Sequence, residues 1–195
     1  MLKSLIGHTA SKALLPVSQV AYRLRITPNQ ITVVGMLLTL IVGVFIWQGH
    51  WLSAGLVLLL SGLLDLLDGS LARNFRMETR FGAFLDSTCD RISDAAIHLG
   101  LAFYYAQNET GLLWPFLCCI AFLGAFMTSY ARARAECLIL RCDVGLAERP
   151  ERIVLILAGL LFGVMKPAIV ILIVVSTLTV LQRIGHTFRQ LRNGK

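Results

Sequence analysis

The sequence has 195 residues, of which 56% are hydrophobic and 15% are charged, and its mean hydropathy is +0.73. This composition is too apolar for an ordinary soluble domain, and it predicts one polytopic membrane domain over residues 1–195. The net charge of +7 does not indicate nucleic acid as a partner, because the basic residues lie in loops beside apolar segments.

The chain begins with residues 1–25, which are moderately apolar and basic and are interrupted by a proline. This pattern predicts a helix that lies in the membrane interface on the cytoplasmic side, with a frayed tail as the alternative. A helix start follows at Thr27, which is suited to be the N-cap. Pro28 would take the first position, and Gln30 could complete a capping box. A six-helix core is therefore expected over residues 26–187.

Six apolar segments follow, so we expect an all-α integral membrane protein with six transmembrane helices. Six spans put both termini on one side, and of the 18 Lys and Arg residues only Lys166 falls in an outside loop. That asymmetry predicts cytoplasmic termini. Lys166 and Pro167 are expected to turn the chain between the last two spans. The predicted spans are residues 31–47, 51–73, 82–105, 113–130, 153–165 and 168–181.

Four aspartates lie where the second and third spans meet the predicted cytoplasmic side. Asp65 and Asp68 are three residues apart, and Asp86 and Asp90 are four apart, so each pair shares one face of a helix. The basic connection 74–80 makes the two helices antiparallel neighbours, and the pairs are expected to meet at one depth. Carboxylates at membrane depth persist mainly where they pair, bind ions or do chemistry.

These carboxylates predict a metal site. Four of them in one cleft need cations between them, and oxygen ligands favour Mg2+, Mn2+ or Ca2+ over Zn2+. Two ions roughly 3.5–4 Å apart would suit in-line displacement at phosphorus. We therefore expect two Mg2+ ions, with Mn2+ as the alternative. Gly69, Ala72 and Gly82 would leave room for a phosphate, and Arg73 and Arg76 would supply positive charge.

The run Asp-x2-Asp-Gly-x2-Ala-Arg-x8-Gly-x3-Asp-x3-Asp resembles the signature of the CDP-alcohol phosphotransferases. The resemblance implies a transferase of phospholipid biosynthesis that takes CDP-diacylglycerol or CDP-archaeol as donor and releases CMP. It implies that Asp65, Asp68, Asp86 and Asp90 hold the metals and that Asp90 is the general base. The donor-binding positions that it implies are Asn29, Gln30, Ile31, Thr32, Gly69, Arg73 and Thr79. The alternative for Asn29 and Gln30 is a role in helix capping alone.

Arginines gather at the predicted cytoplasmic ends of the later spans. Arg132 follows the fourth span, Arg149 and Arg152 open the fifth, and Arg183 ends the sixth. Converging arginines suit an acceptor that already carries a phosphate, whereas a choline acceptor would require an aromatic cage. The alternative is that each arginine only anchors the cytoplasmic end of its helix at the membrane surface, as the positive-inside rule describes.

Two further motifs bear on the acceptor. Ser-Tyr-x-x-Ala-Arg-Ala-Glu from Ser129 and Gly-Leu-x-Glu-Arg-Pro-Glu-Arg from Gly145 resemble one branch of the family. That branch makes phosphatidylinositol phosphate in actinobacteria and archaetidylinositol phosphate in archaea, which implies inositol phosphate as the phosphorylated polyol acceptor. Arg132 stands where the branch often has Lys. Glycerol 3-phosphate is the alternative acceptor.

A membrane cation transporter is the competing class of protein. Transport would favour acidic residues spread through the membrane depth, whereas these cluster toward one face beside arginines that repel cations. Gly159 and Gly163 form a small-xxx-small pair, which permits close helix packing within the chain or at a homodimer seam. The resemblance implies a homodimer surrounded by membrane lipids.

Overall fold

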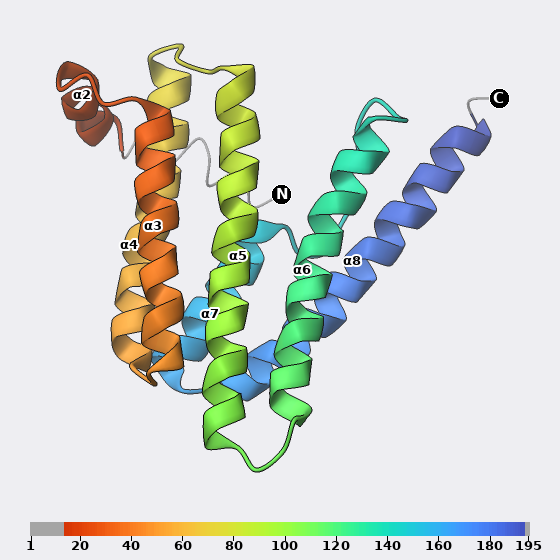
Figure 1. Ribbon diagram of the computed structural model, residues 1–195. Coiled ribbons are helices and arrows are strands. Elements are labelled where there is room, and N and C mark those ends of the chain that lie inside the picture. The colour runs from red at the N-terminus through yellow and green to blue at the C-terminus, as the bar shows by residue number, and fades with distance from the viewer. Residues whose placement is uncertain (1–13, 194–195) are drawn as a thin grey trace. The chain divides into compact units, whose positions relative to one another are not determined.

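Helices make up most of the computed structural model, which describes residues 14–193 (Figure 1). Each of the five prolines lies within the first three residues of a helix, where a missing N–H leaves no helical hydrogen bond unmade. The described residues contain no strand, so the all-α fold class is confirmed. The helices are α2 (Leu15–Arg23), α3 (Pro28–Trp47), α4 (Trp51–Asn74), α5 (Arg80–Asn108), α6 (Leu113–Glu136), α7 (Arg149–Phe162) and α8 (Met165–Asn193).

Of the described helices, α3, α4, α6 and α8 are long and apolar enough to cross a membrane. The other two predicted spans coincide with α5, which carries several charged residues, and with α7, which has 14 residues. Fourteen helical residues cover about 21 Å, less than the roughly 30 Å of a hydrocarbon core. The six-span count therefore stays a prediction. The interfacial placement of residues 1–25 also stays one, because residues 1–13 lie outside the described residues.

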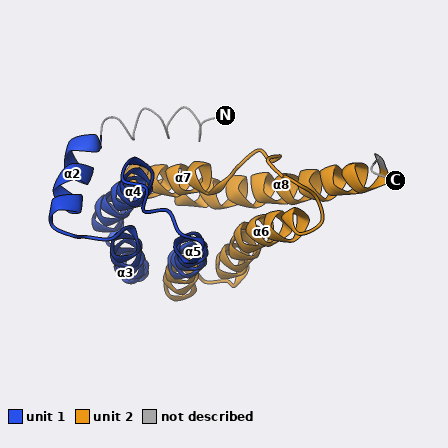
Figure 2. Ribbon diagram, turned by 90° about the horizontal axis from the view of Figure 1, so that it is seen from above, with its two compact units in different colours: residues 1–97 blue, residues 98–195 orange. Residues whose placement is uncertain are grey.

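α3 and α4 pack side by side in the first of two compact units, residues 1–97 (Figure 2). Between them, Ser61 Oγ donates to the Gly35 carbonyl oxygen across 2.9 Å. α5 approaches α3 at Gly43, where an added Cβ would lie 2.5 Å from the Ala96 carbonyl oxygen. Only glycine permits this backbone contact, so the facing residues of α3 and α5 are held in a fixed register.

The short helix α2 packs against the C-terminal end of α4 in the same unit. The hydroxyl oxygens of Ser18 and Ser70 lie 3.0 Å apart and are both buried. Tyr22 stacks on Phe75 with ring centroids 4.3 Å apart. These contacts anchor the end of α4 that carries Asp65 and Asp68.

The second compact unit, residues 98–195, contains α6, α7, α8 and the end of α5. A Cβ at Gly124 would lie 3.0 Å from Ser176 Cβ, and a Cβ at Gly159 would lie 2.9 Å from Met165 Cε. Small residues thus bring α6 and α7 close to α8. The predicted close packing at Gly159 occurs within the chain.

The prediction for the turn before the last helix was wrong. α7 ends at Phe162, and Gly163 caps it in the left-handed region with φ 69°. Glycine adopts this conformation without a Cβ clash, so Gly163 ends a helix and is not half of a packing pair. Lys166 and Pro167 lie in the first turn of α8, because proline fits that position.

Candidate active site

A capping box opens α3. The Thr27 N–H donates to Gln30 Oε1 (2.8 Å), and the Gln30 N–H donates to Thr27 Oγ1 (3.4 Å). With Pro28 in the first turn, this confirms the helix start that the sequence predicts. The box fixes the first turn of α3 and sets Asn29 and Thr32 on the wall of a cleft in the first unit.

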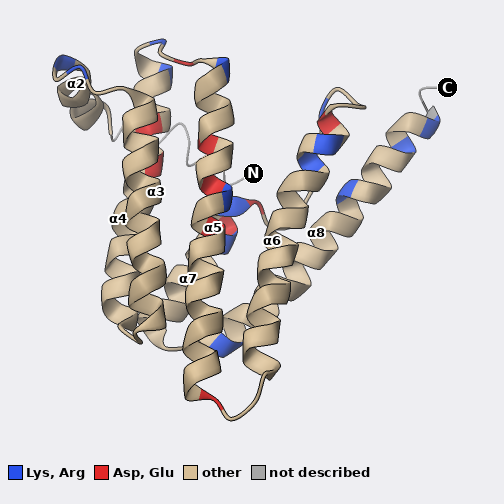
Figure 3. Cartoon of the chain, viewed as in Figure 1, with Lys and Arg blue, Asp and Glu red and all other residues tan. Residues whose placement is uncertain are grey.

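Three of the four predicted metal-binding aspartates come together in this unit. One carboxylate oxygen each from Asp65, Asp68 and Asp86 lies within 4.8 Å of the others. Asp65 and Asp68 share a face of α4, and Asp86 comes from the second turn of α5. Figure 3 shows acidic segments of α4 and α5 at neighbouring heights. The meeting of two helices at one acidic centre therefore agrees with their spacing in the sequence.

Asp90 does not belong to this group of described residues. It lies one turn beyond Asp86 on α5 and is half-buried. Arg91 Nη2 lies 3.4 Å from Asp90 Oδ2, and Arg91 Nε lies 3.9 Å from Asp94 Oδ2. Asp90 therefore has a cationic neighbour on its own helix.

Asp68 is the most buried of the three clustered aspartates, with 7% of its surface exposed. Its Oδ2 accepts a hydrogen bond from Thr32 Oγ1 across 2.6 Å, and the same hydroxyl lies 3.0 Å from the Pro28 carbonyl oxygen. A hydroxyl has one proton, and a carboxylate is the stronger acceptor. Thr32 therefore orients Asp68, a role that the sequence did not predict.

A cleft of about 310 Å³ opens beside these carboxylates. Its size is at the lower end of ligand pockets, which hold about 300–1,000 Å³. The start of α3, the end of α4 and the start of α5 all contribute to it. Its wall is formed by Pro28, Asn29, Thr32, Asp68, Gly69, Ala72, Arg73, Met77, Glu78, Thr79, Gly82, Ala83 and Asp86.

Two glycines shape the cleft. A Cβ at Gly69 would lie 3.0 Å from Arg73 Nη1, so the guanidinium group extends across the bare glycine. The Gly82 N–H donates to Thr79 Oγ1 across 2.9 Å. A Cβ at Gly82 would lie 2.9 Å from that oxygen and 3.0 Å from Asn29 Oδ1. A larger residue at either position would displace polar groups of the wall.

Two of the predicted donor-binding residues are not among the described residues that line the cleft. The Gln30 side chain belongs to the capping box, and Ile31 is buried in a cluster with Ala21 and Leu71. The Gln30 side chain thus makes the contact that a helix-capping role requires. Sequence reasoning missed other parts of the wall, because only the path of the connection and the first turn of α5 place them there. These are Met77, Glu78 and Ala83.

The acidic cluster fits a divalent cation. All its donor atoms are carboxylate oxygens, which are the ligands that hard cations prefer. Three carboxylates this close repel one another unless a cation lies among them. Asp65 is exposed and Asp86 is half-buried, so the cluster is open to solvent on one side. Asp65, Asp68 and Asp86 could therefore hold the metal.

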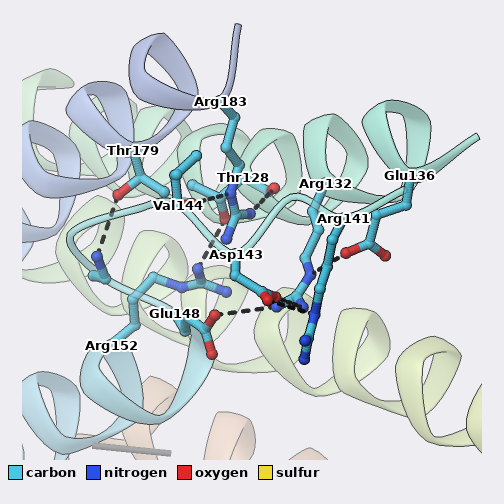
Figure 4. Close-up of polar contacts among 11 residues, drawn as sticks. Thr128, Arg132, Glu136, Arg141, Asp143, Val144, Glu148, Arg152, Thr179 and Arg183 are labelled. Atoms are coloured by element: carbon cyan, nitrogen blue, oxygen red, sulfur yellow. Dashed lines mark hydrogen bonds and ion pairs between the residues drawn. The ribbon is translucent and has the colours of Figure 1, made fainter. Parts of the chain in front are cut away.

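In the second unit, Arg132 binds three carboxylates at once (Figure 4). Its Nε donates to Glu136 (3.0 Å), its Nη1 to Glu148 (3.1 Å) and its Nη2 to Asp143 (2.9 Å). Asp143 also pairs with Arg141 across 2.5 Å. The network ties the end of α6 to the connection that leads to α7. A guanidinium group has five N–H donors, so Arg132 has two N–H donors beyond these three bonds.

Arg152 and Arg183 meet at Thr128 (Figure 4). Arg152 Nη1 donates to Thr128 Oγ1 across 2.8 Å. Arg183 Nη1 donates to the Thr128 carbonyl oxygen, and Arg183 Nε donates to the Val144 carbonyl oxygen across 2.9 Å. Positive-inside anchors face water, whereas Arg152 and Arg183 are only 5% and 3% exposed. Their burial favours a role in a polar binding site over a role as membrane-surface anchors. Arg149, at the start of α7, is half-buried.

Comparison of the sequence with known proteins gives consistent matches over most of the chain. A family model described as CDP-alcohol phosphatidyltransferase matches residues 25–182. Archaetidylinositol phosphate synthase of Pyrococcus horikoshii is 37% identical over 172 residues, which cover 88% of this chain and 88% of that protein. Phosphatidylinositol phosphate synthase of Mycobacteroides abscessus is 37% identical over 192 residues, which cover 93% and 86%.

The fold is similar to that of a solved relative. A crystal structure of Mycobacterium tuberculosis phosphatidylinositol phosphate synthase with CDP-DAG bound has a TM-score of 0.82 and 31% identity. The match covers 89% of this chain and 92% of that one. A second structure of the same protein, in complex with manganese and citrate, also has a TM-score of 0.82.

Proposed function

The chain belongs to the CDP-alcohol phosphatidyltransferase family, and from that premise we propose that it transfers a phosphatidyl or archaetidyl group from a CDP-linked lipid to inositol phosphate, releasing CMP. The relatives named as phosphatidylinositol or archaetidylinositol phosphate synthases support this acceptor. The observation that carries the proposal is the cluster of Asp65, Asp68 and Asp86 beside a cleft that also contains Arg73.

The cleft of the first unit is the proposed donor site. Arg73 would bind phosphate oxygens, for which the planar fork of arginine is well suited. Gly69 and Gly82 leave space for the diphosphate, and Asn29 and Thr79 offer hydrogen-bonding groups to the rest of the nucleotide. A structure of a relative with CDP-DAG bound supports this donor class.

Two Mg2+ ions, with Mn2+ as the alternative, complete the proposed site. Asp65, Asp68 and Asp86 would hold them together with Asp90 from the next turn of α5, and the manganese complex of a relative supports a divalent metal. When bound, such ions neutralise the diphosphate and polarise the phosphorus attached to the lipid. Thr32 would keep Asp68 correctly directed.

Asp90 is the proposed general base. Its carboxylate takes the proton of the acceptor hydroxyl while the hydroxyl oxygen attacks the phosphorus attached to the lipid. The bond from this phosphorus to the bridging oxygen of the diphosphate breaks, and CMP leaves with that oxygen. The lipid phosphate remains on the new alcohol.

The acceptor phosphate is assigned to the arginines of the second unit. Arg132, Arg149, Arg152 and Arg183 would bind it through charge-assisted hydrogen bonds. Glycerol 3-phosphate is the alternative acceptor, because the same arginines would bind its phosphate. CDP-diacylglycerol and CDP-archaeol both fit the proposal as donors.

The chain is a membrane protein, and four of its described helices can cross a bilayer. We further propose six spans, with the active site and both termini on the cytoplasmic side, on the basis of the asymmetric basic residues. Residues 1–25, with α2 near their end, would lie in the membrane interface. A homodimer is proposed from the family resemblance alone.

The decisive test is CMP release by purified protein in lipid nanodiscs. Each donor is combined with inositol phosphate, free inositol, glycerol 3-phosphate or serine. We expect inositol phosphate to give the highest rate. A clear preference for glycerol 3-phosphate would show that the protein has the alternative function, transfer to glycerol 3-phosphate. Cation uptake into proteoliposomes, without CMP release from any pair, would instead favour the transporter class.

A further inference from the structure

Thr128 links two of the proposed acceptor-binding arginines. It lies near the C-terminal end of α6 and is 0% exposed. Arg152 reaches it from α7, and Arg183 reaches it from α8 (Figure 4). One buried residue thus contacts two buried guanidinium groups from two other helices.

The direction of the Thr128 hydroxyl is fixed by its partners. It lies 2.8 Å from the Ala125 carbonyl oxygen and 2.8 Å from Arg152 Nη1. A carbonyl oxygen can only accept and a guanidinium group can only donate. The hydroxyl proton therefore points to Ala125, and a lone pair of the oxygen faces Arg152.

The Thr128 backbone holds the second arginine. Its carbonyl oxygen accepts from Arg183 Nη1, while Arg183 Nε donates to the Val144 carbonyl oxygen. Arg183 therefore connects α6 to the segment before α7, and two hydrogen bonds fix the orientation of its guanidinium group. A side-chain substitution at Thr128 leaves this carbonyl in place. Of the two arginine contacts it therefore removes only the bond to Arg152, together with the hydroxyl's own bond to the Ala125 carbonyl within α6.

We propose that Thr128 is a positioning residue for acceptor binding, which holds the Arg152 guanidinium group in the orientation that receives the acceptor phosphate. The proposal rests on the proposed function. An arginine side chain has many rotamers, and ordering it before the ligand arrives lowers the entropy lost on binding. A valine in its place would leave a buried N–H of Arg152 without this acceptor.

The test compares Thr128→Val with Thr128→Ser, which keeps the hydroxyl. Thr39→Val is the matched control, because Thr39 is also a buried threonine but its hydroxyl contacts Ser61 and the Gly35 carbonyl. Steady-state CMP release gives KM for the acceptor and for the CDP-lipid separately. If Thr128→Val does not fold, Thr128→Ala takes its place.

We expect Thr128→Val to raise the acceptor KM about tenfold, which corresponds to about 1.4 kcal/mol, with little change in donor KM. Thr128→Ser and Thr39→Val should stay within about twofold of the wild type on the same scale. In an Arg152→Gln background, Thr128→Val should add little, since it acts through Arg152. An unchanged acceptor KM, or an equal rise with Thr128→Ser or Thr39→Val, would overturn the proposal.

A second readout separates this inference from the proposed function. Inorganic phosphate should raise the Tm of the wild-type protein and of Thr39→Val, and should raise that of Thr128→Val much less. CMP release by the wild type with the different acceptors tests the proposed reaction. The loss of the phosphate-induced rise in Tm in Thr128→Val tests the role of Thr128. Equal shifts in all three proteins would overturn the inference, whichever acceptor the wild type prefers.

Discussion

Thr32 Oγ1 donates to Asp68 Oδ2 across 2.6 Å, and this bond joins the first turns of α3 to the acidic cluster of α4 and α5. The capping box at Thr27 holds the end of α3 from which Thr32 projects. The start of α3 therefore does more than line the proposed donor cleft. It also orients the most buried of the proposed metal ligands.

Replacing Thr32 with valine should weaken metal binding. The change removes the hydrogen bond to Asp68, and the loss of such outer contacts typically costs about 10–100-fold in metal affinity or activity. The measurement is the Mn2+ concentration that gives half-maximal CMP release, which should rise by a similar factor. Thr32→Ser should restore the wild-type value. Equal metal requirements for all three proteins would show that Thr32 does not act through the metal.

Replacing Asp90 with asparagine should abolish turnover but leave binding of the CDP-lipid donor largely intact. The variant loses a proton acceptor and one negative charge, and a general base contributes typically about 10²–10⁴-fold. CMP release measures the loss, and the binding of CDP-lipid to the purified variant should persist. Near-normal turnover would exclude Asp90 as the base.

Removal of divalent cations should stop the reaction. Three carboxylates within 4.8 Å supply only oxygen ligands, so Mg2+ or Mn2+ should restore CMP release after chelation, and Zn2+ should restore it poorly. The assay follows CMP release during metal titration of chelator-treated protein. Full activity after exhaustive chelation would rule out the metal-dependent reaction.

The sequence predicted four aspartates at one centre, and three of them cluster in the structure, because helical spacing is a local property. Asp65 and Asp68 lie one turn apart, and Asp86 follows a short connection, so their meeting required no knowledge of distant contacts. The start of α3 was predictable for the same reason, since a capping box involves Thr27 and Gln30 alone.

The remaining contacts depend on tertiary packing. Arg183 donates to the carbonyl oxygens of Thr128 and Val144, and backbone acceptors this distant leave no pattern in the sequence. The bond from Thr32 to Asp68 is similar, because 36 residues separate the partners. Gly163 was misjudged because a glycine four residues after another is compatible with both a packing pair and a helix cap.

Gly82→Ala should weaken donor binding. The new Cβ would lie 2.9 Å from Thr79 Oγ1 and 3.0 Å from Asn29 Oδ1, so the cleft wall must shift. Overpacking of this kind typically costs about 1–3 kcal/mol, so the donor KM should rise about tenfold. Gly62→Ala is the control, since beyond its chain neighbours and its own helix backbone no described atom lies within 4 Å of its Cβ position. An unchanged donor KM for Gly82→Ala would place the donor elsewhere.

Arg132→Gln should weaken binding of the acceptor more than binding of the donor. A hydrogen bond to a charged group contributes about 1.5–3 kcal/mol, so the acceptor KM should rise on the order of 10- to 100-fold. Free inositol should be a poor acceptor for the wild type, because it would leave these arginines without their anion. CMP release with inositol phosphate, free inositol, glycerol 3-phosphate and serine measures both effects.

The control for this variant is Arg141→Gln. Arg141 pairs with Asp143, as Arg132 does, but its side chain is 82% exposed. An exposed ion pair contributes about 0–1 kcal/mol, so the acceptor KM of Arg141→Gln should stay within roughly fivefold of the wild type. The stability of both variants is compared by Tm, because Arg132 also binds three carboxylates. If Arg132→Gln lowered Tm but left the acceptor KM unchanged, Arg132 would be a clamp of the connection before α7 and no part of the phosphate site.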